Sequence, residues 1–148
     1  MMTKIFYKIL ENGTDLYNLK KGTEDSAGFD LMAAIKEKIT LKPSRTELIP
    51  AGFCLEMPKD FEAQVRPRSG LALKNSVTVL NSPGTIDADY RGEVGVILIN
   101  HSKKNFDIHR GMRIAQIIFS RVPETVLIEK SSLSKTKRDQ GGFGSTGV

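Results

Sequence analysis

Two carboxylates and a tyrosine follow a sharp turn in the middle of the chain, between Asn81 and Glu93. Pro83-Gly84 suits the two central positions of a type II turn, so this segment is predicted to form a tight hairpin. In an extended backbone Asp87 and Asp89 would share a face, which suits a general base or a site for a hard cation. Aspartate is also common in turns for structural reasons, and the segment alone leaves both interpretations open.

A second candidate site is Arg66-Pro67-Arg68-Ser69-Gly70-Leu71-Ala72, where an arginine and a serine begin a short helical pattern at residues 69–74. A guanidinium, a hydroxyl and the free N–H groups of a first helical turn together bind anions. Ser69 would serve equally well as an ordinary N-cap beside solvated arginines, so this motif alone does not decide.

The end of the chain, from Arg138 to Val148, is rich in glycine. Glycines let backbone N–H groups converge on phosphate oxygens, and Ser145 and Thr146 add hydroxyl donors. The segment is not a P-loop, because no lysine follows a glycine and no helical pattern comes after it. We expect a β domain at residues 1–130 and a flexible tail at 131–148, and a simple linker would have the same composition.

Single polar residues interrupt two apolar strand patterns, Asp30 in one and Gln116 in the other. A buried polar group needs a partner, so each is expected to satisfy a neighbour or to face a ligand. His101 and His109 have loop-like surroundings and no third ligand nearby, which predicts surface residues. The single cysteine, Cys54, excludes an intrachain disulfide and a multi-cysteine zinc site, and its strand-like surroundings predict a partly buried thiol.

Composition describes one ordinary globular domain of 148 residues, with 39% hydrophobic and 26% charged residues. The net charge of +5 is spread along the chain, apart from one cluster at residues 130–138, so nucleic-acid binding is not favoured. Lys4 and Lys8 interrupt the N-terminal apolar pattern, and no apolar run reaches membrane-spanning length. We therefore expect a cytoplasmic protein without a membrane partner.

Short strands separated by turn residues predict an all-β sandwich or barrel. The expected strands are Ile5–Ile9, Asp30–Ala33, Lys38–Leu41, Thr46–Ile49, Phe53–Met57, Glu62–Val65, Val77–Leu80, Glu93–Ile99, Phe106–Ile108, Arg113–Phe119 and Val126–Ile128. After its first residue the Glu93–Ile99 pattern is apolar on both faces, which predicts a strand covered on both sides.

Five motifs in this order resemble those of the trimeric dUTPases, and together they extend from residue 27 to residue 147. They are Ala27-Gly28-Phe29-Asp30-Leu31, Pro67-Arg68-Ser69-Gly70-Leu71-Ala72, Gly84-Thr85-Ile86-Asp87-Ala88-Asp89-Tyr90-Arg91-Gly92, Arg113-Ile114-Ala115-Gln116, and Arg138 followed by Gly141-Gly142-Phe143-Gly144-Ser145-Thr146-Gly147. The resemblance implies a jelly-roll-like β fold and a homotrimer, in which the tail of one subunit closes over a pocket built by the other two.

The resemblance also implies an activity, the hydrolysis of dUTP to dUMP and pyrophosphate, which limits uracil in DNA and supplies dUMP for dTTP synthesis. Asp87 would activate the water that attacks the α-phosphate. The base and sugar would be held by Asn81, Gly84, Thr85, Ile86, Tyr90 and Phe143. The phosphates would be held by Arg68, Ser69, Gly70, Gln116, Arg138, Gly142, Ser145 and Thr146. Mg²⁺ would sit mainly on the substrate phosphates, with Asp30 reaching it through water.

Two rival functions belong to the same fold. A dCTP deaminase would use a glutamate on the base and a different sequence around the turn, whereas Thr85-Ile86-Asp87-Ala88-Asp89-Tyr90 resembles the hydrolases. A regulatory protein-binding member would not need Asp87, Tyr90 and the tail together. Phe29 and Met112 depart from residues common in the family, tyrosine and an acidic residue, and neither is an expected catalytic group.

Overall fold

The computed structural model describes residues 2–17, 19 and 21–142, and it confirms an all-β architecture. Within these ranges one α-helix, α1 (Ser69–Asn75), and one 3-10 turn, η1 (Glu11–Gly13), accompany the strands. The strands are β1 (Phe6–Ile9), β2 (Phe29–Met32), β3 (Ile39–Leu41), β4 (Thr46–Glu56), β5 (Phe61–Arg66), β6 (Val77–Val79), β7 (Gly84–Ile86), β8 (Glu93–Asn100), β9 (Phe106–Ile108) and β10 (Arg113–Arg121).

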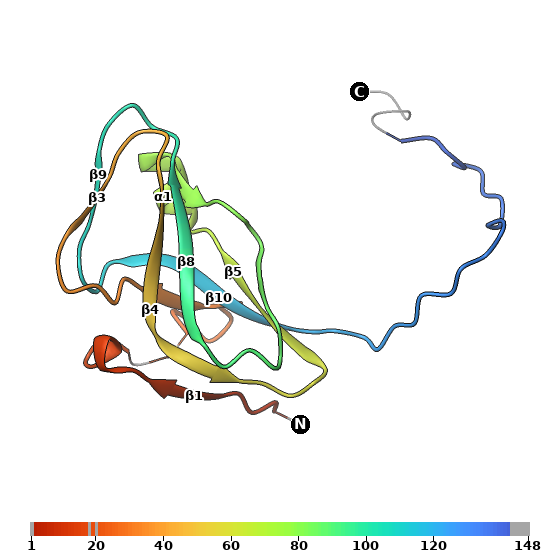
Figure 1. The fold of residues 1–148 in the computed structure, drawn as a ribbon, viewed down its shortest axis with the longest axis horizontal. Helices are drawn as coiled ribbons and strands as arrows, with labels where there is room; N and C mark the ends of the chain where they lie inside the picture. The colour runs from red at the N-terminus through yellow and green to blue at the C-terminus, as the bar shows by residue number, and fades with distance from the viewer. Residues whose placement is uncertain (1, 18, 20, 143–148) are drawn as a thin grey trace.

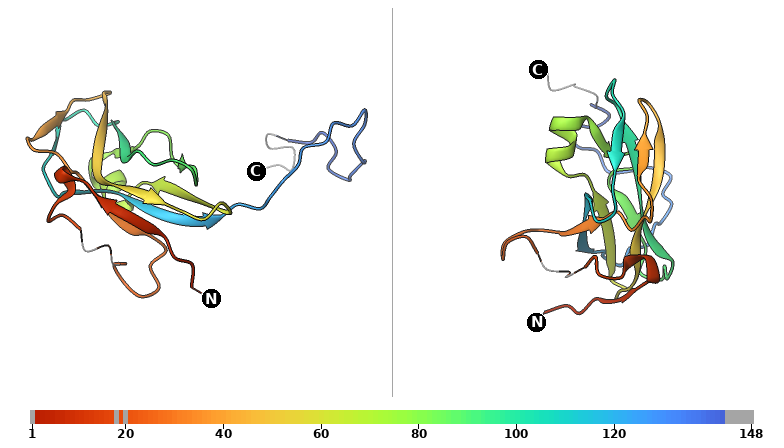
Figure 2. Two further views of the ribbon diagram at one scale, coloured as in Figure 1. Left: turned by 60° about the horizontal axis from the view of Figure 1, so that its bottom comes forward. Right: turned by 90° about the vertical axis from the view of Figure 1, so that its left-hand side faces the viewer.

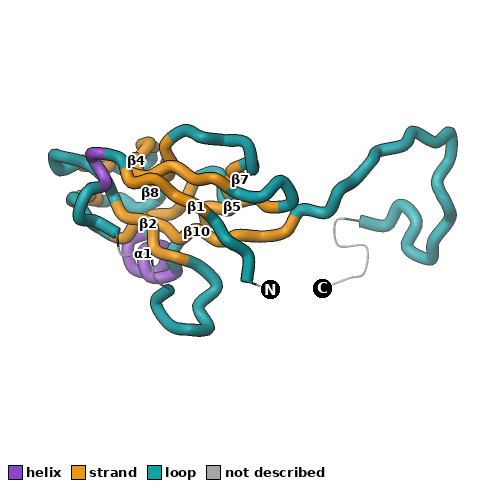
Figure 3. Tube along the Cα trace, turned by 90° about the horizontal axis from the view of Figure 1, so that it is seen from below, coloured by secondary structure: helices purple, strands orange, loops and turns teal. Residues whose placement is uncertain are grey.

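The strands form two four-stranded sheets in the orders β1-β4-β8-β6 and β2-β10-β5-β7, and β3 and β9 pair separately. Figure 1 shows β4 and β8 in front of β5 and β10, and Figure 3 shows the same two layers from below, with α1 at one end. Apolar side chains that alternate along the strands fill the space between the layers. The result is the jelly-roll-like sandwich expected from the sequence.

Strand β8 illustrates how the pattern specifies the layers. Its residues alternate between buried and half-buried along the whole strand. Val94, Val96 and Leu98 point into the core, while Gly95 and Ile97 lie on the outer face of the sheet. None of its residues is fully exposed, in agreement with the prediction that both faces are covered, although the outer face is covered only in part.

Two predicted strands, Thr46–Ile49 and Phe53–Met57, are one continuous strand β4. Residues 50–52, which separated the two predicted strands, form a bulge instead of a break, because the pairing with β8 shifts between Pro50 and Cys54. Gly52 has a φ of 80°, a conformation that favours glycine. The Glu93 carboxylate accepts the Gly52 N–H at 2.8 Å, so the bulge leaves that backbone donor satisfied. Cys54 is half-buried, as predicted.

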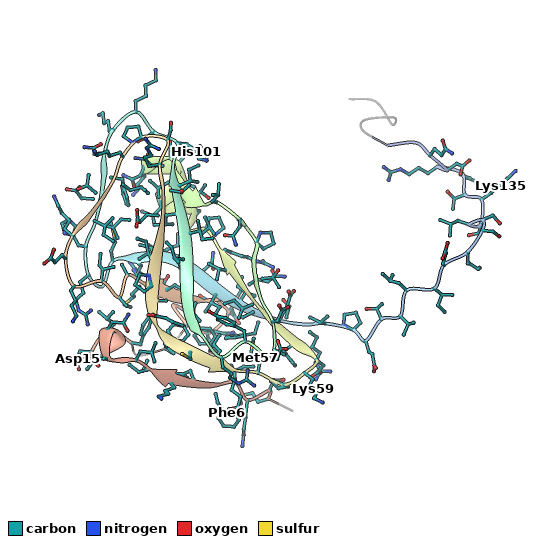
Figure 4. All side chains as sticks on the ribbon, in the orientation of Figure 1. Phe6, Asp15, Met57, Lys59, His101 and Lys135 are labelled. Carbon is teal, nitrogen blue, oxygen red and sulfur yellow. The ribbon has the colours of Figure 1, made fainter. Side chains whose placement is uncertain are left out.

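The strand predicted at Val126–Ile128 is wrong for the described chain, in which β10 ends at Arg121 and the following segment is irregular. All side chains from 122 to 140 are exposed, and Leu127 is 98% exposed. Figure 2 shows the segment leaving the sandwich beyond β10, and Figure 4 shows Lys135 far from the strands. An apolar sequence pattern forms a strand only where another strand supplies hydrogen-bond partners, and among the described residues this segment meets none.

Asn100, at the end of β8, is polar and 0% exposed, and its side chain joins the end of β3 to the loop after β8. Its amide donates to the carbonyl of Leu41 at 2.9 Å and to that of Lys104 at 2.8 Å. Its side-chain oxygen accepts the N–H of Ser102 at 2.9 Å. A buried amide with all these bonds made orders the loops that it joins.

Replacing Asn100 by alanine is expected to lower the free energy of unfolding by about 3 kcal/mol, because three hydrogen bonds of about 1 kcal/mol each are lost. Urea unfolding measures this difference. Asn105→Ala, at an exposed position in the loop after β8, is the matched control and should change stability by less than about 0.5 kcal/mol. Equal stability of the two variants would show that Asn100 does not hold the loops.

Candidate active site

A hollow of about 290 Å³ lies beside β7, the loop that follows it, and β8. Its lining includes all the predicted base, sugar and catalytic residues outside the tail, which are Asn81, Gly84, Thr85, Ile86, Asp87 and Tyr90. The rest of the lining comes from the strands, through Leu48, Val65, Glu93, Val94, Gly95 and Ile97. Nothing in the local pattern around Leu48 or Gly95 singled these residues out, because only strand pairing brings them to the hollow.

The turn that shapes this hollow differs from the predicted one. The Ser82–Pro83 peptide bond is cis, and Gly84 begins β7 without the positive φ that a type II turn requires. Strand β7 pairs with β5, whereas β6 before the turn pairs with β8. The predicted tight hairpin is therefore wrong, and the segment carries the chain from one sheet to the other.

At Gly84 the backbone passes close to the side chain of Asn81. A Cβ at this position would lie 3.0 Å from the amide nitrogen of Asn81. The absence of a side chain lets the Asn81 amide pack directly against the start of β7. The amide and the β7 backbone therefore present their polar groups side by side at the hollow.

Asp87 and Asp89 do not share a face. The chain turns at Ala88-Asp89, where the Tyr90 N–H bonds the Asp87 carbonyl at 3.2 Å, and the Arg91 guanidinium donates to the Ala88 carbonyl at 2.7 Å. Asp87 lines the hollow and Asp89 does not. A site built on the two carboxylates is therefore not supported, because the backbone here is a turn and not an extended strand.

Tyr90 lies across the rim of the hollow with 48% of its surface exposed. Its hydroxyl donates to the Glu93 carbonyl at 3.3 Å. A Cβ on Gly92 would collide with the Tyr90 ring, so glycine is what allows the ring to fold back toward β8. The partly exposed ring thus forms part of the lining of the hollow.

A second cluster brings together residues from three distant parts of the sequence. Gln116 on β10 is the cross-strand partner of Asp30 on β2, so the two polar residues predicted inside apolar strands are neighbours. The Asp30 carboxylate pairs with Arg68 at 3.4 Å and with Arg113 at 3.2 Å. Gln116 donates to the Pro67 carbonyl at 3.0 Å.

Arg113 was not among the predicted site residues, although it stands in one of the five motifs. Besides its pair with Asp30, its carbonyl accepts a hydrogen bond from Arg68 at 2.9 Å. Its strand position gave no sign of this role, because the contact depends on where β10 meets α1 and β2.

Ser69 and Gly70 are exposed at the first turn of α1. The residue at the N-cap is Arg68, and no side chain caps the helix, so the interpretation of Ser69 as an N-cap is wrong. The helix has the predicted position, and its first N–H groups have no partner within the helix. Together with the Arg68 guanidinium they form a cationic end beside the Asp30 cluster.

The predicted site residues thus fall into two groups within one chain, because neither Arg68, Ser69, Gly70 nor Gln116 lines the hollow beside Asp87. From the tail, Arg138 donates from its Nε to the Gly141 carbonyl at 2.7 Å, and Gly142 is half-buried. Phe143, Ser145 and Thr146 lie outside the described residues.

The described residues provide one carboxylate, Asp30, beside the cationic end of α1, and no group of three potential metal-ligating side chains occurs among them. His101 and His109 are exposed, as predicted. This donor set does not fit a Mg²⁺ ion enclosed by protein ligands. It fits an ion held chiefly by the phosphates of a ligand, with one carboxylate nearby.

Within the described part of the chain, neither α1 nor η1 is long and apolar enough to span a membrane.

Comparison with known proteins places these features in one family. The model of the dUTPase family matches residues 15–147. The deoxyuridine 5'-triphosphate nucleotidohydrolase of Rickettsia felis is 53% identical over 147 residues, covering 99% of each chain. The protein of the same name from Neorickettsia sennetsu is 51% identical over 140 residues, covering 95% of this chain and 94% of its own.

Solved structures agree in fold. A mutant dUTPase of Staphylococcus bacteriophage 80alpha with dUpNHpp superimposes with a TM-score of 0.88 at 22% identity, covering 99% of this chain and all of its own. A mutant dUTPase from phage phi11 of S. aureus, described with a structural Mg(II) ion, has a TM-score of 0.78 at 19% identity, covering 89% of this chain and 99% of its own. At these identities the likeness shows the fold alone, whereas the family model covers nearly the whole sequence. The chain belongs to the dUTPase family.

Proposed function

We propose that this chain hydrolyses dUTP to dUMP and pyrophosphate. The observation that carries the proposal is the hollow of about 290 Å³, around which Asn81, Asp87 and Tyr90 gather together with the backbone of β7. Relatives more than half identical over nearly the full length are named for the same activity. Such an enzyme would limit uracil in DNA and supply dUMP for dTTP synthesis.

Uracil binds against the β7 segment in this proposal. The Asn81 amide and the polar backbone groups of Gly84–Ile86 supply donors and acceptors, and cytosine is rejected because its amino group would leave some of them unpaired. Thymine is rejected in this proposal because the backbone beside the uracil ring would leave no room for the additional methyl group. The Tyr90 ring packs on the deoxyribose and leaves no room for a 2′-hydroxyl.

Asp87 acts as the general base. Its side chain is exposed at the hollow, where the carboxylate can accept a proton from the attacking water. The water oxygen bonds to the α-phosphorus as the bond from that phosphorus to the bridging oxygen breaks, and pyrophosphate leaves. Phosphoanhydride hydrolysis depends mainly on positioning and charge neutralisation, so one carboxylate suffices.

The phosphate chain meets the cationic end of α1. Arg68, Ser69 and the Gly70 N–H supply a charge, a hydroxyl and a backbone donor, and Gln116 adds an amide. Mg²⁺ neutralises phosphate charge when it is bound, with Asp30 as the nearby protein carboxylate. Arg138, Gly142, Phe143, Ser145 and Thr146 would come from the tail, with the ring of Phe143 on the base.

A homotrimer explains why the two groups of site residues lie apart in one chain. The outer face of β4 and β8 carries apolar residues, and Leu48, which is 63% exposed, and Leu80, which follows β6 and is 51% exposed, both lie beside Ile97. Leu48, Gly95 and Ile97 also line the hollow. A second copy covering this face would therefore border the hollow and could bring its own α1 to the phosphates.

Asp30 is expected to act by holding Arg68, since Arg68 and Arg113 already engage both of its oxygens. Asp30→Asn should weaken binding of an α,β-imido analogue of dUTP by about tenfold, with or without Mg²⁺. Stability should change by less than about 1 kcal/mol, because the ion pairs are partly exposed. Calorimetric titration at two Mg²⁺ concentrations measures the effect.

The matched control is Asp60→Asn. This aspartate pairs at 3.7 Å with Arg121, which lies at the far end of β10 from Gln116. This variant should bind the analogue normally. If Asp30→Asn weakened binding only when Mg²⁺ was present, the residue would act on the metal rather than on Arg68.

The proposed function is tested by incubating the purified protein with Mg²⁺ and each of dUTP, dTTP, dCTP and UTP, and by following pyrophosphate release and base identity together. We expect pyrophosphate and dUMP from dUTP alone. Ammonia from dCTP would place the protein with the deaminases. No reaction with any of the four would mean that the site is used for binding, as in a regulatory protein.

A further inference from the structure

A second hollow, of about 350 Å³, lies at the end of the sandwich where α1 ends and the loop after β8 begins. It is lined by Lys74, Asn75, Ser76, Ser102, Lys103, Lys104, Asn105 and Phe106. None of these residues belongs to the candidate active site or to the five motifs. Figure 4 shows His101, whose N–H bonds the Ser76 carbonyl at 2.9 Å, at this end beside α1.

The charge around this hollow is of one sign. The two segments that line it, residues 74–76 and 102–106, carry Lys74, Lys103 and Lys104 and no aspartate or glutamate. The ion pairs among the described residues engage other side chains, Lys38, Arg68, Arg113 and Arg121. Cations brought together without a carboxylate repel one another, and an anion between them relieves this repulsion.

The segments are held in place by buried contacts and not by the lysines. Asn100 bonds the Leu41 and Lys104 carbonyls and the Ser102 N–H. Its own backbone carbonyl accepts the Ser44 N–H at 2.7 Å. The backbone that carries Lys103 and Lys104 is thus positioned before any ligand arrives, which lowers the entropy that binding would cost.

The remaining lining suits phosphate. Within the described part of the chain, the side chains of Asn75, Ser76 and Asn105 make no hydrogen bond to other side chains or to the backbone, so their donors are available to a ligand. Lysine ammonium groups, hydroxyls and amides are the donors that bind phosphate oxygens. The volume lies at the lower end of the range for small-molecule sites, and Phe106 provides one apolar wall.

We propose that this hollow binds a small anion with two or more phosphate groups, at a site separate from the substrate pocket. Two sources share this chemistry, a free oligophosphate and the phosphate chain of a nucleotide. The two sites lie at opposite ends of helix α1, which is seven residues long. The first residues of the helix belong to the candidate active site, and its last residues, Lys74 and Asn75, line this hollow.

The test compares two triple variants of the full chain with equal change in charge. One is Lys74→Gln, Lys103→Gln and Lys104→Gln together, and the control is Lys8→Gln, Lys36→Gln and Lys59→Gln, three exposed lysines elsewhere. Tripolyphosphate and ATP are titrated into each protein, and backbone amide shifts are followed by NMR. In the unchanged chain we expect shifts at residues 74–76 and 102–105. In the first variant affinity at these amides should fall about tenfold, and in the control it should be retained.

Equal affinity for the two probes would assign the site to the phosphate chain alone, and tighter ATP binding would assign it to a nucleotide that also contacts Phe106. Three outcomes would overturn the proposal. Shifts confined to residues 68–71 would mean that the anion binds only at the active site. An equal loss of affinity in both triple variants would mean that binding depends only on the net charge of the protein and not on this hollow. Binding of single-stranded DNA at this end with no response to either probe would mark a polynucleotide surface.

Discussion

Asp87→Asn is expected to lower the turnover of dUTP by about 10² to 10⁴ while substrate binding persists, because the amide has the shape of the carboxylate but cannot accept the proton of water. The Asp87 side chain is exposed at the hollow, so the substitution leaves the core unchanged. Turnover is measured by pyrophosphate release. Binding is measured by calorimetric titration with an α,β-imido analogue of dUTP.

Asp89→Asn provides the matched control, since Asp89 is also exposed, lies two residues further along, and does not line the hollow. We expect this variant to turn over dUTP like the unchanged chain. Two results would show that Asp87 is not the general base. One is an Asp87→Asn variant that binds the analogue poorly but turns over normally whatever dUTP it binds. The other is an Asp89→Asn variant whose turnover falls as much as that of Asp87→Asn.

Removal of residues 140–148 is expected to abolish nearly all activity and to leave a folded trimer. The described chain from 122 to 140 is exposed and adds nothing to the core, so the loss of the following residues should not unfold the sandwich. Activity should disappear because Phe143, Ser145 and Thr146 are removed together, and with them a ring for the base and donors for the phosphates. Pyrophosphate release, circular dichroism and light scattering after gel filtration measure activity, folding and assembly.

Phe143→Ala serves as the comparison for this deletion. Stacking of a base on an aromatic ring is worth about 1–3 kcal/mol, so this variant should lose affinity for the analogue but keep part of its activity. A truncated chain that was monomeric or unfolded would show that the tail contributes to the structure. Full activity of the truncated chain would show that the tail is not part of the active site.

The local sequence determined many elements correctly. The helix at 69–74, a β8 strand with no fully exposed residue and the half-buried Cys54 all appear in the structure as predicted. Each depends on a property of neighbouring residues, such as helical spacing or alternation, and such properties can be identified without knowing what packs against them. The motifs likewise indicated the family, because the order of residue types along the chain carries that information.

Pairing between strands that are distant in the sequence decided which of the predicted residues lie next to one another. The sequence predicted Asp30 and Gln116 as isolated polar residues, and only the register of β2 on β10 makes them neighbours and adds Arg113. Leu48 reaches the hollow because β4 pairs with β8.

Three local predictions failed for the same reason. The chain at Pro83-Gly84 changes sheets where a hairpin was predicted, because β7 finds its partner in β5. The predicted break in β4 disappears because its pairing with β8 continues past a bulge. Val126–Ile128 has the composition of a strand but no partner among the described residues. The sequence therefore determined which segments can form strands and which residues can do chemistry. Only the tertiary structure decided which strands pair, because a strand is stable only when another segment, distant in the sequence, supplies its hydrogen bonds and covers its apolar face.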